Sequence, residues 1–401
     1  MQMLKKQCHK VRFMGKYKNH LKLLLFIVLV LLFVGGLFLL QQEKTYSLVF
    51  IYYMSYDNDL NSVGPGILSD LQRGIINSKI AVVVQADFSN NKGMKRIALY
   101  QSFGKTKRKE IPLKSEDSAD PAELKKYFEW ILQNFKSKNY CIVFLNHGGK
   151  LNDMCRDDKP FRDQSKNKQY ASGKWLPATE VGEIVADFNR KTGGKVRLLF
   201  LQQCGRAAIQ NLYNFIDTAE YILASPVIVD VPNTYYTKAI KAAADDPNMT
   251  GAILAKTIMQ EDRDYTLYTL LDNNELEKLP DKLTPILNCF TQNSSLNPSQ
   301  SCVPIFDFEG EKFYDLKYYF ETLNSANHDI AEKELRVFFD WSDNHLIVSK
   351  HFKNFRPLAE SSRSGLSIYI PSSQKDIGRY DFLPLNQQTN LENLTKFVVD
   401  K

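Results

Sequence analysis

The sequence predicts an α/β fold, in which a mostly parallel six-stranded sheet is flanked by helices, carries a helical insertion and follows one transmembrane helix. Three observations predict it. Short apolar runs rich in β-branched and aromatic residues alternate with longer amphipathic stretches, the pattern of strands and helices in a parallel sheet. The short runs are almost continuously apolar, as in strands covered on both faces. A much longer apolar run lies near the start of the chain, at Leu23–Leu40.

The first 42 residues are strongly basic, with seven Lys and Arg and no acidic residue. The whole chain has 52 Lys and Arg against 45 Asp and Glu, so the rest holds 45 of each sign. A neutral remainder lacks the basic surface that nucleic-acid-binding proteins need. We therefore expect no nucleic-acid partner.

The run Leu23–Leu40 predicts a membrane anchor. Its 18 residues, at about 1.5 Å each, reach about 27 Å, close to the thickness of a bilayer core. The alternative is a cleaved signal peptide, whose apolar region is usually about 7 to 15 residues long and is followed by small residues, whereas Leu-Gln-Gln-Glu-Lys follows here. Because the positive charges precede the span, residues 1–22 are expected in the cytoplasm and the bulk of the chain outside it.

Six strands are expected after the anchor, each an apolar run bounded by turn residues. They are Ser47–Met54, Ile80–Ala86, Tyr140–Asn146, Val196–Gln202, Tyr221–Ser225 and Gly365–Ile370. A hairpin is expected from Ile97–Phe103 and Glu110–Leu113, with GKTKRK as its tip. The positive charges of this tip suit a solvated turn, and contact with an acidic lipid or polymer is the alternative.

Seven amphipathic stretches predict helices. They are Asn58–Ser78, Pro121–Lys136, Pro177–Lys191, Ala207–Thr218, Gly251–Gln260, Leu267–Phe290 and Tyr314–Asn324. Asp120 before Pro121 is a strong start signal, since it places an N-cap residue before proline at the first helical position. The expected organisation is a core at 45–235, a mostly helical insertion or subdomain at 236–345, and a closing strand with a C-terminal segment at 346–401.

Five of the six cysteines follow the predicted anchor, an odd number for an oxidising compartment, so at least one thiol is expected to be unpaired. Cys289 and Cys302 flank a polar stretch and are the pair suited to close a small loop, although their spacing does not establish a bond. Cys141 lies in an apolar run and is read as core.

Two expected strands end in reactive residues. IVFLNHGG ends at His147, and VRLLFLQQC ends at Cys204 with the helix-forming stretch Gly205–Tyr213 behind it. Sites in parallel sheets form at the carboxyl ends of strands, so both residues are expected on one edge. A helix N-terminus and an imidazole would lower the pKa of a thiol there. Taken alone, a His before Gly-Gly is commonly a turn residue and a buried Cys commonly inert, and only their joint placement favours catalysis.

The chain resembles the clostripain-like cysteine peptidases of the caspase and gingipain superfamily over roughly Leu48–Pro371. The resemblance rests on pieces that occur in the family's order: VFIYYMSYDNDL, NHGG, LLFLQQCG, TAEYILAS, FYDLKYYF and GLSIYIP. It implies a caspase/hemoglobinase-like fold with the peptidase core at 45–235. It also implies that His147 is the general acid/base and Cys204 the nucleophile, that the backbone amides of Gly148 and Cys204 form the oxyanion hole, and that no third residue is needed.

One position departs from the family pattern. Family members commonly have an Asp two residues before the nucleophile, where it binds a basic P1 side chain, but this chain has Gln202. An amide does not neutralise Arg or Lys, so the P1 preference is open. Asp230, which follows the next strand, is the candidate to supply the missing charge, with a plain loop Asp as the alternative.

The sequence requires no cofactor. Asp57 and Asp59 are read as residues that cap the following helix rather than as metal ligands, and calcium enters only through the resemblance. The family also allows self-cleavage in the loop after the histidine strand, here Arg156–Lys174. With Gln202 in place of Asp, self-cleavage is not expected.

The sequence therefore predicts a membrane-anchored extracytoplasmic cysteine endopeptidase that acts on protein or peptide substrates through a His147/Cys204 dyad and a thioester. The alternative is a retired peptidase fold that acts as a surface binding protein. Gln202 and the unusual segment Gln203-Cys204-Gly205-Arg206 suggest this alternative, and the presence of both dyad residues argues against it.

Overall fold

The structure, a computed structural model, describes residues 25–30, 44–88, 93–161, 164–263, 265–292, 302–353, 358 and 363–394. The chain divides into two compact units, 1–45 and 46–401. In the first unit, residues 25–30 are helical, and most of the predicted span Leu23–Leu40 and the whole basic tail 1–22 lie outside the described residues. Within the described ranges, none of the helices is both long and apolar enough to cross a membrane.

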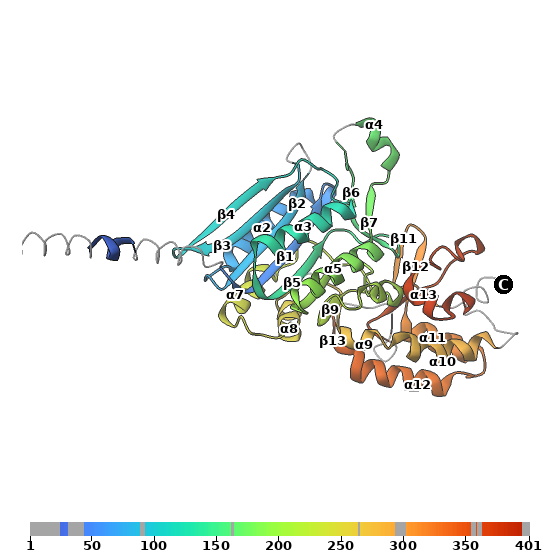
Figure 1. Ribbon diagram of the computed structural model, residues 1–401. Helices are drawn as coiled ribbons and strands as arrows, with labels where there is room; N and C mark the ends of the chain where they lie inside the picture. The colour runs from blue at the N-terminus through green and yellow to red at the C-terminus, as the bar shows by residue number, and fades with distance from the viewer. Residues whose placement is uncertain are drawn as a thin grey trace, which may run out of the picture. The chain divides into compact units, whose positions relative to one another are not determined.

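The second unit alternates strands with helices, as the sequence pattern predicted (Figure 1). Its strands are β1 Tyr46–Tyr56, β2 Ile80–Phe88, β3 Lys95–Ser102, β4 Lys105–Pro112, β5 Ser137–Leu145, β6 Asp153–Asp157, β7 Lys174–Pro177, β8 Val196–Gln202, β9 Tyr221–Ala224, β10 Leu267–Asp272, β11 Phe306–Phe308, β12 Glu311–Asp315, β13 Ile347–Phe352 and β14 Ser367–Tyr369.

Its α-helices are α2 Gly64–Gly74, α3 Pro121–Asn134, α4 Gln164–Asn167, α5 Ala178–Thr192, α6 Ile209–Leu212, α7 Tyr236–Asp245, α8 Gly251–Glu261, α9 Asn273–Leu276, α10 Leu279–Thr291, α11 Leu316–Ala326, α12 Glu332–Trp341 and α13 Pro384–Gln388. Shorter helical turns are η1 Asp59–Ser62, η2 Lys168–Tyr170, η3 Tyr213–Phe215, η4 Ser342–Leu346 and η6 Gln374–Asp376.

The main sheet confirms the predicted α/β class but is larger than expected. It has nine strands in the order β13-β10-β9-β8-β5-β1-β2-β3-β4, and its five central strands, β9 to β2, run parallel. Antiparallel strands extend it on both sides. The predicted sixth strand, Gly365–Ile370, does not join this sheet, because β14 instead pairs with β12 in a separate three-stranded sheet.

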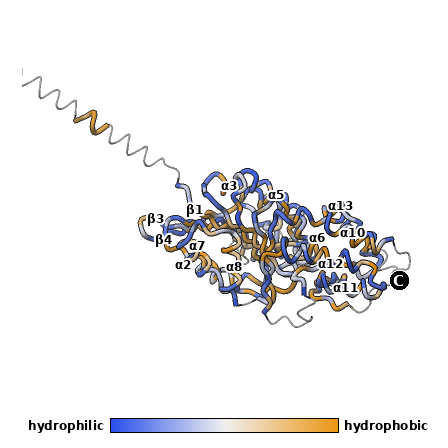
Figure 2. The backbone as a smooth tube through the Cα atoms, turned by 90° about the horizontal axis from the view of Figure 1, so that it is seen from below, coloured by the Kyte–Doolittle hydropathy of each residue, from blue (hydrophilic) through white to orange (hydrophobic). Residues whose placement is uncertain are grey.

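Helices cover both faces of the sheet. Along β1, Val49 and Ile51 pack on the face covered by α3 and α5, while Phe50 and Tyr52 pack on the face covered by α2, α7 and α8. Successive side chains of a strand point to opposite faces, which explains why the strand is apolar at almost every position. The orange stretches of Figure 2 accordingly run through the interior of the domain.

Three predicted elements differ in the structure. Leu267–Phe290, expected as one helix, is strand β10 followed by α9 and α10, because a short apolar run does not distinguish a strand from a buried helix. Asn58–Ser78 contains η1 and the shorter α2, and Ala207–Thr218 contains only α6 and η3. By contrast, Asp120 caps α3 as predicted, accepting a hydrogen bond from the backbone N–H of Ala122.

The predicted hairpin exists with another register. β3 and β4 pair up to Ser102 and Lys105, so the turn is Phe103–Gly104 and most of the basic segment lies within β4 rather than at a tip. Both turn residues have positive φ, 51° and 70°, which is the requirement of the two-residue turns that suit the twist of a hairpin.

The remaining expectations concern residues 236–345 and three of the cysteines. Residues 236–345 are rich in helix, but they also contribute β10 to the main sheet and β11 and β12 to the small one. Cys141 is fully buried core, as expected. Cys289 and Cys302 are not joined by a disulfide.

Candidate active site

Sheet topology brings His147 and Cys204 to the same edge. β5 and β8 are parallel neighbours in which Leu145 pairs with Gln202, so the two reactive residues each follow two positions later. The loops that carry them touch: a Cβ on Gly148 would collide with the carbonyl oxygen of Cys204. Only glycine allows this approach, which is the physical reason for Gly at that position.

The His147 ring contacts a carboxylate that the sequence did not assign to the site. His147 Nε2 lies 2.7 Å from Asp59 Oδ1, and the two side chains are 30% and 73% exposed. Partial burial acts to raise the pKa of Asp59, but the hydrogen bond and the charge of His147 outweigh it and lower this pKa. Asp59 therefore holds the imidazole in one orientation.

Asn58 holds Asp59 in place. Its side-chain amide donates to the backbone oxygen of Arg156 (2.9 Å) and to Asn146 Oδ1 (3.0 Å), beside His147. Its own oxygen accepts from the backbone N–H of Leu60, so Asn58 caps η1. The predicted capping role thus falls to Asn58, and Asp59 is left to reach the histidine.

The Cys204 side chain is only partly accessible to solvent. Val229 covers it: its N–H donates to Sγ at 3.4 Å, and its carbonyl lies 3.9 Å from Sγ. Burial raises the pKa of Cys204, against the opposing hydrogen bond of Val229 and the charge of Arg206. The expectation of a lowered pKa is therefore wrong for this structure. No long helix starts behind the thiol, since α6 has four residues and begins at Ile209.

The two backbone amides predicted as the oxyanion hole both lie beside the sulfur. The backbone N–H of Gly148 faces the thiol, where its hydrogen bond acts to lower the pKa of Cys204. The N–H of Cys204 donates to none of the described residues. Two amides at the edge of the sheet beside the sulfur are the arrangement that stabilises a tetrahedral oxyanion. No hydrogen bond between the described side chains of His147 and Cys204 is formed in this closed state.

Arg206 joins the two catalytic loops. The guanidinium is fully buried and donates to the backbone oxygen of Cys204 at 3.0 Å. Its other donors reach backbone oxygens of the loop after His147, at distances from 2.9 to 3.4 Å: Gly149, Lys150, Leu151 and Asp153. Burial lowers the pKa of Arg206, and the charge of Asp153 opposes this. The sequence signalled this residue only as an unusual neighbour of the cysteine.

Gln202 does not present a free amide in this structure. The side chain is 4% exposed. Its oxygen accepts from Tyr235 at 2.6 Å, and its nitrogen donates to Tyr236 at 3.0 Å and to Asn233. A direct contact between Gln202 and a substrate would require these bonds to break.

Asp230 lies exposed beside the covered thiol, one residue after Val229. It lines a pocket of about 650 Å³ whose other lining residues include Asp70 and Ser62, from the α2 region. Asp70 is already paired with Arg73, so Asp230 is the carboxylate that gives this pocket its acidity. Its acidity is what a basic substrate side chain would require.

Three buried carboxylates lie near the dyad. One oxygen each of Asp57, Asp87 and Asp157 come within 4.8 Å of one another. Oδ2 of Asp87 lacks a hydrogen-bond partner among the described residues. Burial, together with the charge of Asp157, raises the pKa of Asp87 well above its usual value, and burial raises the pKa of Asp157 to about 7. Clustered hard oxygen donors of this kind fit a divalent cation such as Ca²⁺.

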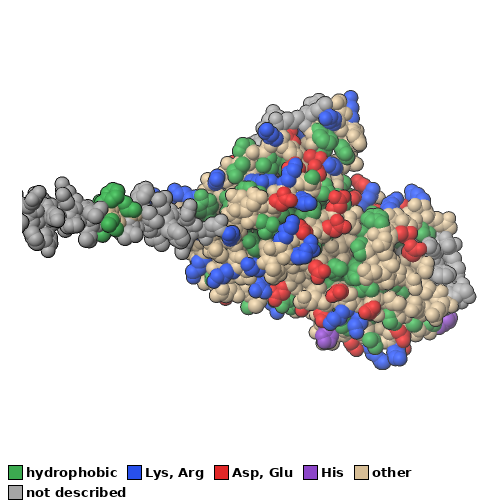
Figure 3. Space-filling model, in the orientation of Figure 1, with side chains coloured by type: hydrophobic (Ala, Val, Ile, Leu, Met, Phe, Trp, Pro, Cys, Tyr) green, Lys and Arg blue, Asp and Glu red, His purple; other side chains and the backbone are tan. Residues whose placement is uncertain are grey.

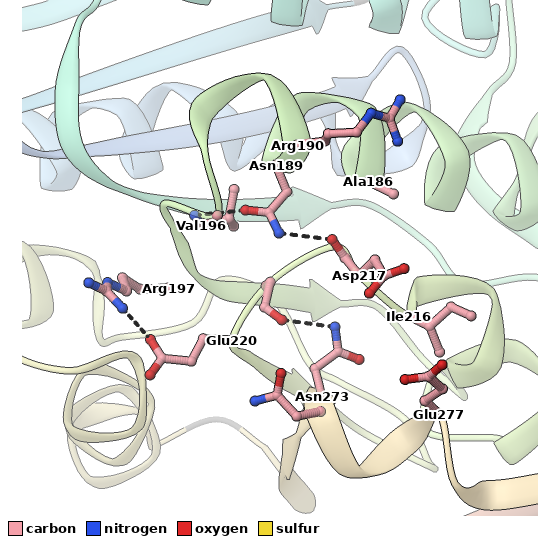
Figure 4. A pocket seen from close by; sticks show the side chains of 13 residues that line it. Ala186, Asn189, Arg190, Val196, Arg197, Ile216, Asp217, Glu220, Asn273 and Glu277 are labelled. Carbon is pink, nitrogen blue, oxygen red and sulfur yellow. Dashed lines mark hydrogen bonds and ion pairs between the residues drawn. The ribbon is translucent and has the colours of Figure 1, made fainter.

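Another pocket, of about 480 Å³, lies at the opposite, amino end of the strands, at the start of β8 and β9 (Figure 4). Several of its polar side chains are paired with one another or with the backbone: Arg197 with Glu220 at 2.9 Å, and Asn189 with the backbone oxygen of Asp217 at 2.8 Å. It is separated from Cys204 by the length of β8, so it is not the site of the dyad's chemistry.

Comparison with known proteins supports the family resemblance and the fold. The model of the clostripain family matches residues 52–396. Among solved structures, an inactive zymogen C11 protease from Parabacteroides distasonis aligns with a TM-score of 0.65 and 14% identity, over 86% of this chain and 99% of that one. A secreted C11 cysteine protease from Bacteroides thetaiotaomicron, in complex with an irreversible peptide inhibitor, aligns with a TM-score of 0.62, 14% identity and the same coverage. The search of curated proteins gave no match.

Proposed function

The chain belongs to the clostripain family of cysteine peptidases, and we propose that it is a membrane-anchored endopeptidase that works through Cys204 and His147. The observation that carries the proposal is the meeting of the two loops at one sheet edge, with the Gly148 N–H directed at the thiol. The proposed dyad and its predicted roles are supported by this arrangement.

The proposed reaction uses groups that lie at this edge. Cys204 Sγ attacks the peptide carbonyl, and the N–H groups of Gly148 and Cys204 stabilise the oxyanion. His147 protonates the leaving amine, and water then cleaves the thioester. Asp59 orients the imidazole and stabilises its charged form, a role that the expected two-residue dyad did not include.

The structure corresponds to a closed form of this enzyme. Val229 lies against Cys204 Sγ, and the partly buried thiol has a raised pKa. We propose that the segment around Val229 moves aside when substrate binds, which would expose the sulfur and let His147 reach it. Thiolate formation would then be coupled to opening.

The acidic pocket supports a basic P1 residue. Asp230 follows Val229, the residue that contacts the thiol, and its charge acts on Cys204, so the wall of the pocket formed by Asp230 is the part nearest the reacting atom. In this proposal Asp230 replaces the Asp that family members commonly have at the position of Gln202. Arg or Lys would place its charge beside Asp230.

The carboxylate cluster fits a structural cation. Asp57, Asp87 and Asp157 would hold it, and it would supply charge compensation among groups from β1, β2 and β6. Asp57 is two residues before Asp59, which contacts His147. A cation that fixes the position of Asp57 would therefore also help to hold Asp59 and the imidazole in place.

The anchor is proposed from the sequence. The 18 apolar residues of Leu23–Leu40 and the seven basic residues before them favour a single span with the catalytic unit outside the cytoplasm.

Digestion of a peptide library tests the function. The full chain is compared with Cys204→Ala, and the residue before each cut is read by mass spectrometry. We expect Cys204-dependent cuts after Arg and Lys that Asp230→Asn weakens, while Asp340→Asn, an exposed acid on α12, changes nothing. Cuts after other residues would refute the basic pocket. An absence of Cys204-dependent cutting, with or without Ca²⁺, would refute the peptidase proposal and favour the surface binding protein.

A further inference from the structure

The turn between β3 and β4 exposes an aromatic ring that contributes nothing to packing. Phe103 is 101% exposed, and none of the described side chains packs against its ring. It also has a positive φ of 51°, a backbone conformation that is strained for a bulky residue relative to the Gly or Asn usual in this turn. Exposure of an apolar ring and a positive φ both disfavour Phe at this position, and no contact among the described residues compensates for them. A contact with something outside the chain would compensate for them.

Lysines surround this turn. Lys105 and Lys107 follow it on β4, and both are exposed. The neighbouring strands begin beside further exposed lysines, which precede or open β2, β5 and β8: Lys79, Lys136, Lys138 and Lys195. Figure 3 shows Lys and Arg side chains gathered at this end of the domain. Acids are also present near this edge: Asn77, two residues before Lys79, donates to the backbone oxygen of Ala244, which precedes Asp245 and Asp246 at the end of α7.

The register places the turn at the edge where the domain's chain begins. Ser47 N–H bonds to the oxygen of Lys79, and Ala81 pairs with Tyr100, so Phe103 lies level with Tyr46. Figures 1 and 2 agree that the β3–β4 turn and the start of β1 occupy one end of the domain. Five residues separate Leu40 from Tyr46, and such a linker spans at most about 20 Å.

We propose that this edge, the Phe103 turn with Lys79, Lys105 and Lys107, docks on an anionic lipid surface, with the Phe103 ring at the headgroup level. The inference rests on the proposed anchor, because a span ending at Leu40 holds this edge within reach of the bilayer. Aromatic rings partition into the interface, and each lysine near an anionic surface strengthens binding about five-fold. Lysines on an edge strand also discourage strand pairing, but that role does not require an exposed Phe.

The contact fixes the direction of the active site. The first residue of β1, where the linker from the proposed anchor enters the domain, and the turn lie at one edge of the sheet, and Cys204 follows the opposite ends of the parallel strands. β5 has nine residues, so the dyad stands about 30 Å farther from the surface. The substrates favoured by this geometry are proteins or peptides that project beyond the lipid headgroups.

Tryptophan quenching tests the contact. The full chain is reconstituted in vesicles of phosphatidylcholine with phosphatidylglycerol, whose acyl chains are brominated. Emission of Phe103→Trp is read after subtraction of the parent, and Phe382→Trp is the matched control, since Phe382 is 51% exposed beside α13. We expect quenching by about half for Phe103→Trp and none for the control. Lys105→Glu with Lys107→Glu should remove it.

The outcomes of this experiment distinguish the docking proposal from the proposed membrane anchor. Peptide cleavage by each reconstituted variant reports that it is folded. Chain that floats with the vesicles while Phe103→Trp stays unquenched would overturn the docking and leave the anchor intact. Chain that fails to float would overturn both. Equal quenching in pure phosphatidylcholine would overturn the preference for anionic lipid.

Discussion

Replacing Arg206 with lysine should damage both the stability and the catalytic step of this peptidase. The guanidinium donates five hydrogen bonds to backbone oxygens, one on the cysteine loop and four on the histidine loop. Lysine keeps the charge but has three donors and a shorter reach. At least two buried carbonyls would lose their partner.

The magnitude follows from this count. A buried polar group left without a hydrogen bond costs about 1 to 3 kcal/mol, so two of them cost about 2 to 6 kcal/mol. Domains are stable by about 5 to 15 kcal/mol, so the loss is a large share of the total. If the loop of Gly148 shifts by about 1 Å relative to Cys204, kcat should fall about 100-fold.

The assay combines urea unfolding with steady-state cleavage of a peptide. Arg197→Lys is the matched control, because Arg197 also makes two side-chain bonds, at 2.8 and 2.9 Å, but is 42% exposed. We expect the control to lose less than about 1 kcal/mol and to keep its kcat.

If Arg206→Lys and Arg197→Lys have the same free energy of unfolding, the Arg206 guanidinium does not hold the two loops together as argued. Loss of stability with an unchanged kcat, measured where both variants are folded, would show that the guanidinium supports the fold without positioning the dyad.

Three further predictions concern the titrating groups. Asp59→Asn should lower kcat about ten-fold with little change in KM, since the amide does not stabilise a charged His147, and an unchanged kcat would remove Asp59 from the site. The raised pKa values of Asp87 and Asp157 mean that the folded state binds more protons than the unfolded one between about pH 4 and 7. As the pH rises over that range, the free energy of unfolding of cation-free protein should therefore fall by a few kcal/mol, and Ca²⁺ at pH 7.5 should restore it. Urea unfolding measures this, and a free energy that does not change with pH would contradict the prediction. Iodoacetamide should alkylate Cys204 slowly at pH 7 and faster above pH 9, because burial raises the pKa of the thiol, whereas a plateau already at pH 6 would mean a preformed thiolate.

The sequence was a good guide wherever a rule links neighbouring residues to topology. Near-continuous apolar runs located the central strands, and because parallel strands end at one edge, His147 and Cys204 could be expected together. The expected Asp120 cap was found as well. Local signals failed where one sequence pattern suits both a strand and a helix. The apolar run Leu267–Asp272 is such a case; it forms β10, and its partner strand β13 was not expected.

Long-range contacts were beyond the sequence. Asp59 meets a histidine 88 positions later, Arg206 binds carbonyls up to 57 positions earlier, and Val229 covers a thiol 25 positions before it. The direction of the Cys204 pKa shift was mispredicted for the same reason, since it depends on what buries the sulfur.

The chain's order of residues thus determined the fold class, the family and the shared sheet edge of His147 and Cys204, because these follow from local patterning and from the geometry common to all parallel sheets. Only the tertiary structure showed that Asp59 contacts the imidazole, that the Arg206 guanidinium joins the two loops, and that Val229 lies against the thiol. Hydrogen bonds and desolvation act through space over a few ångströms, and distance along the chain carries no information about them.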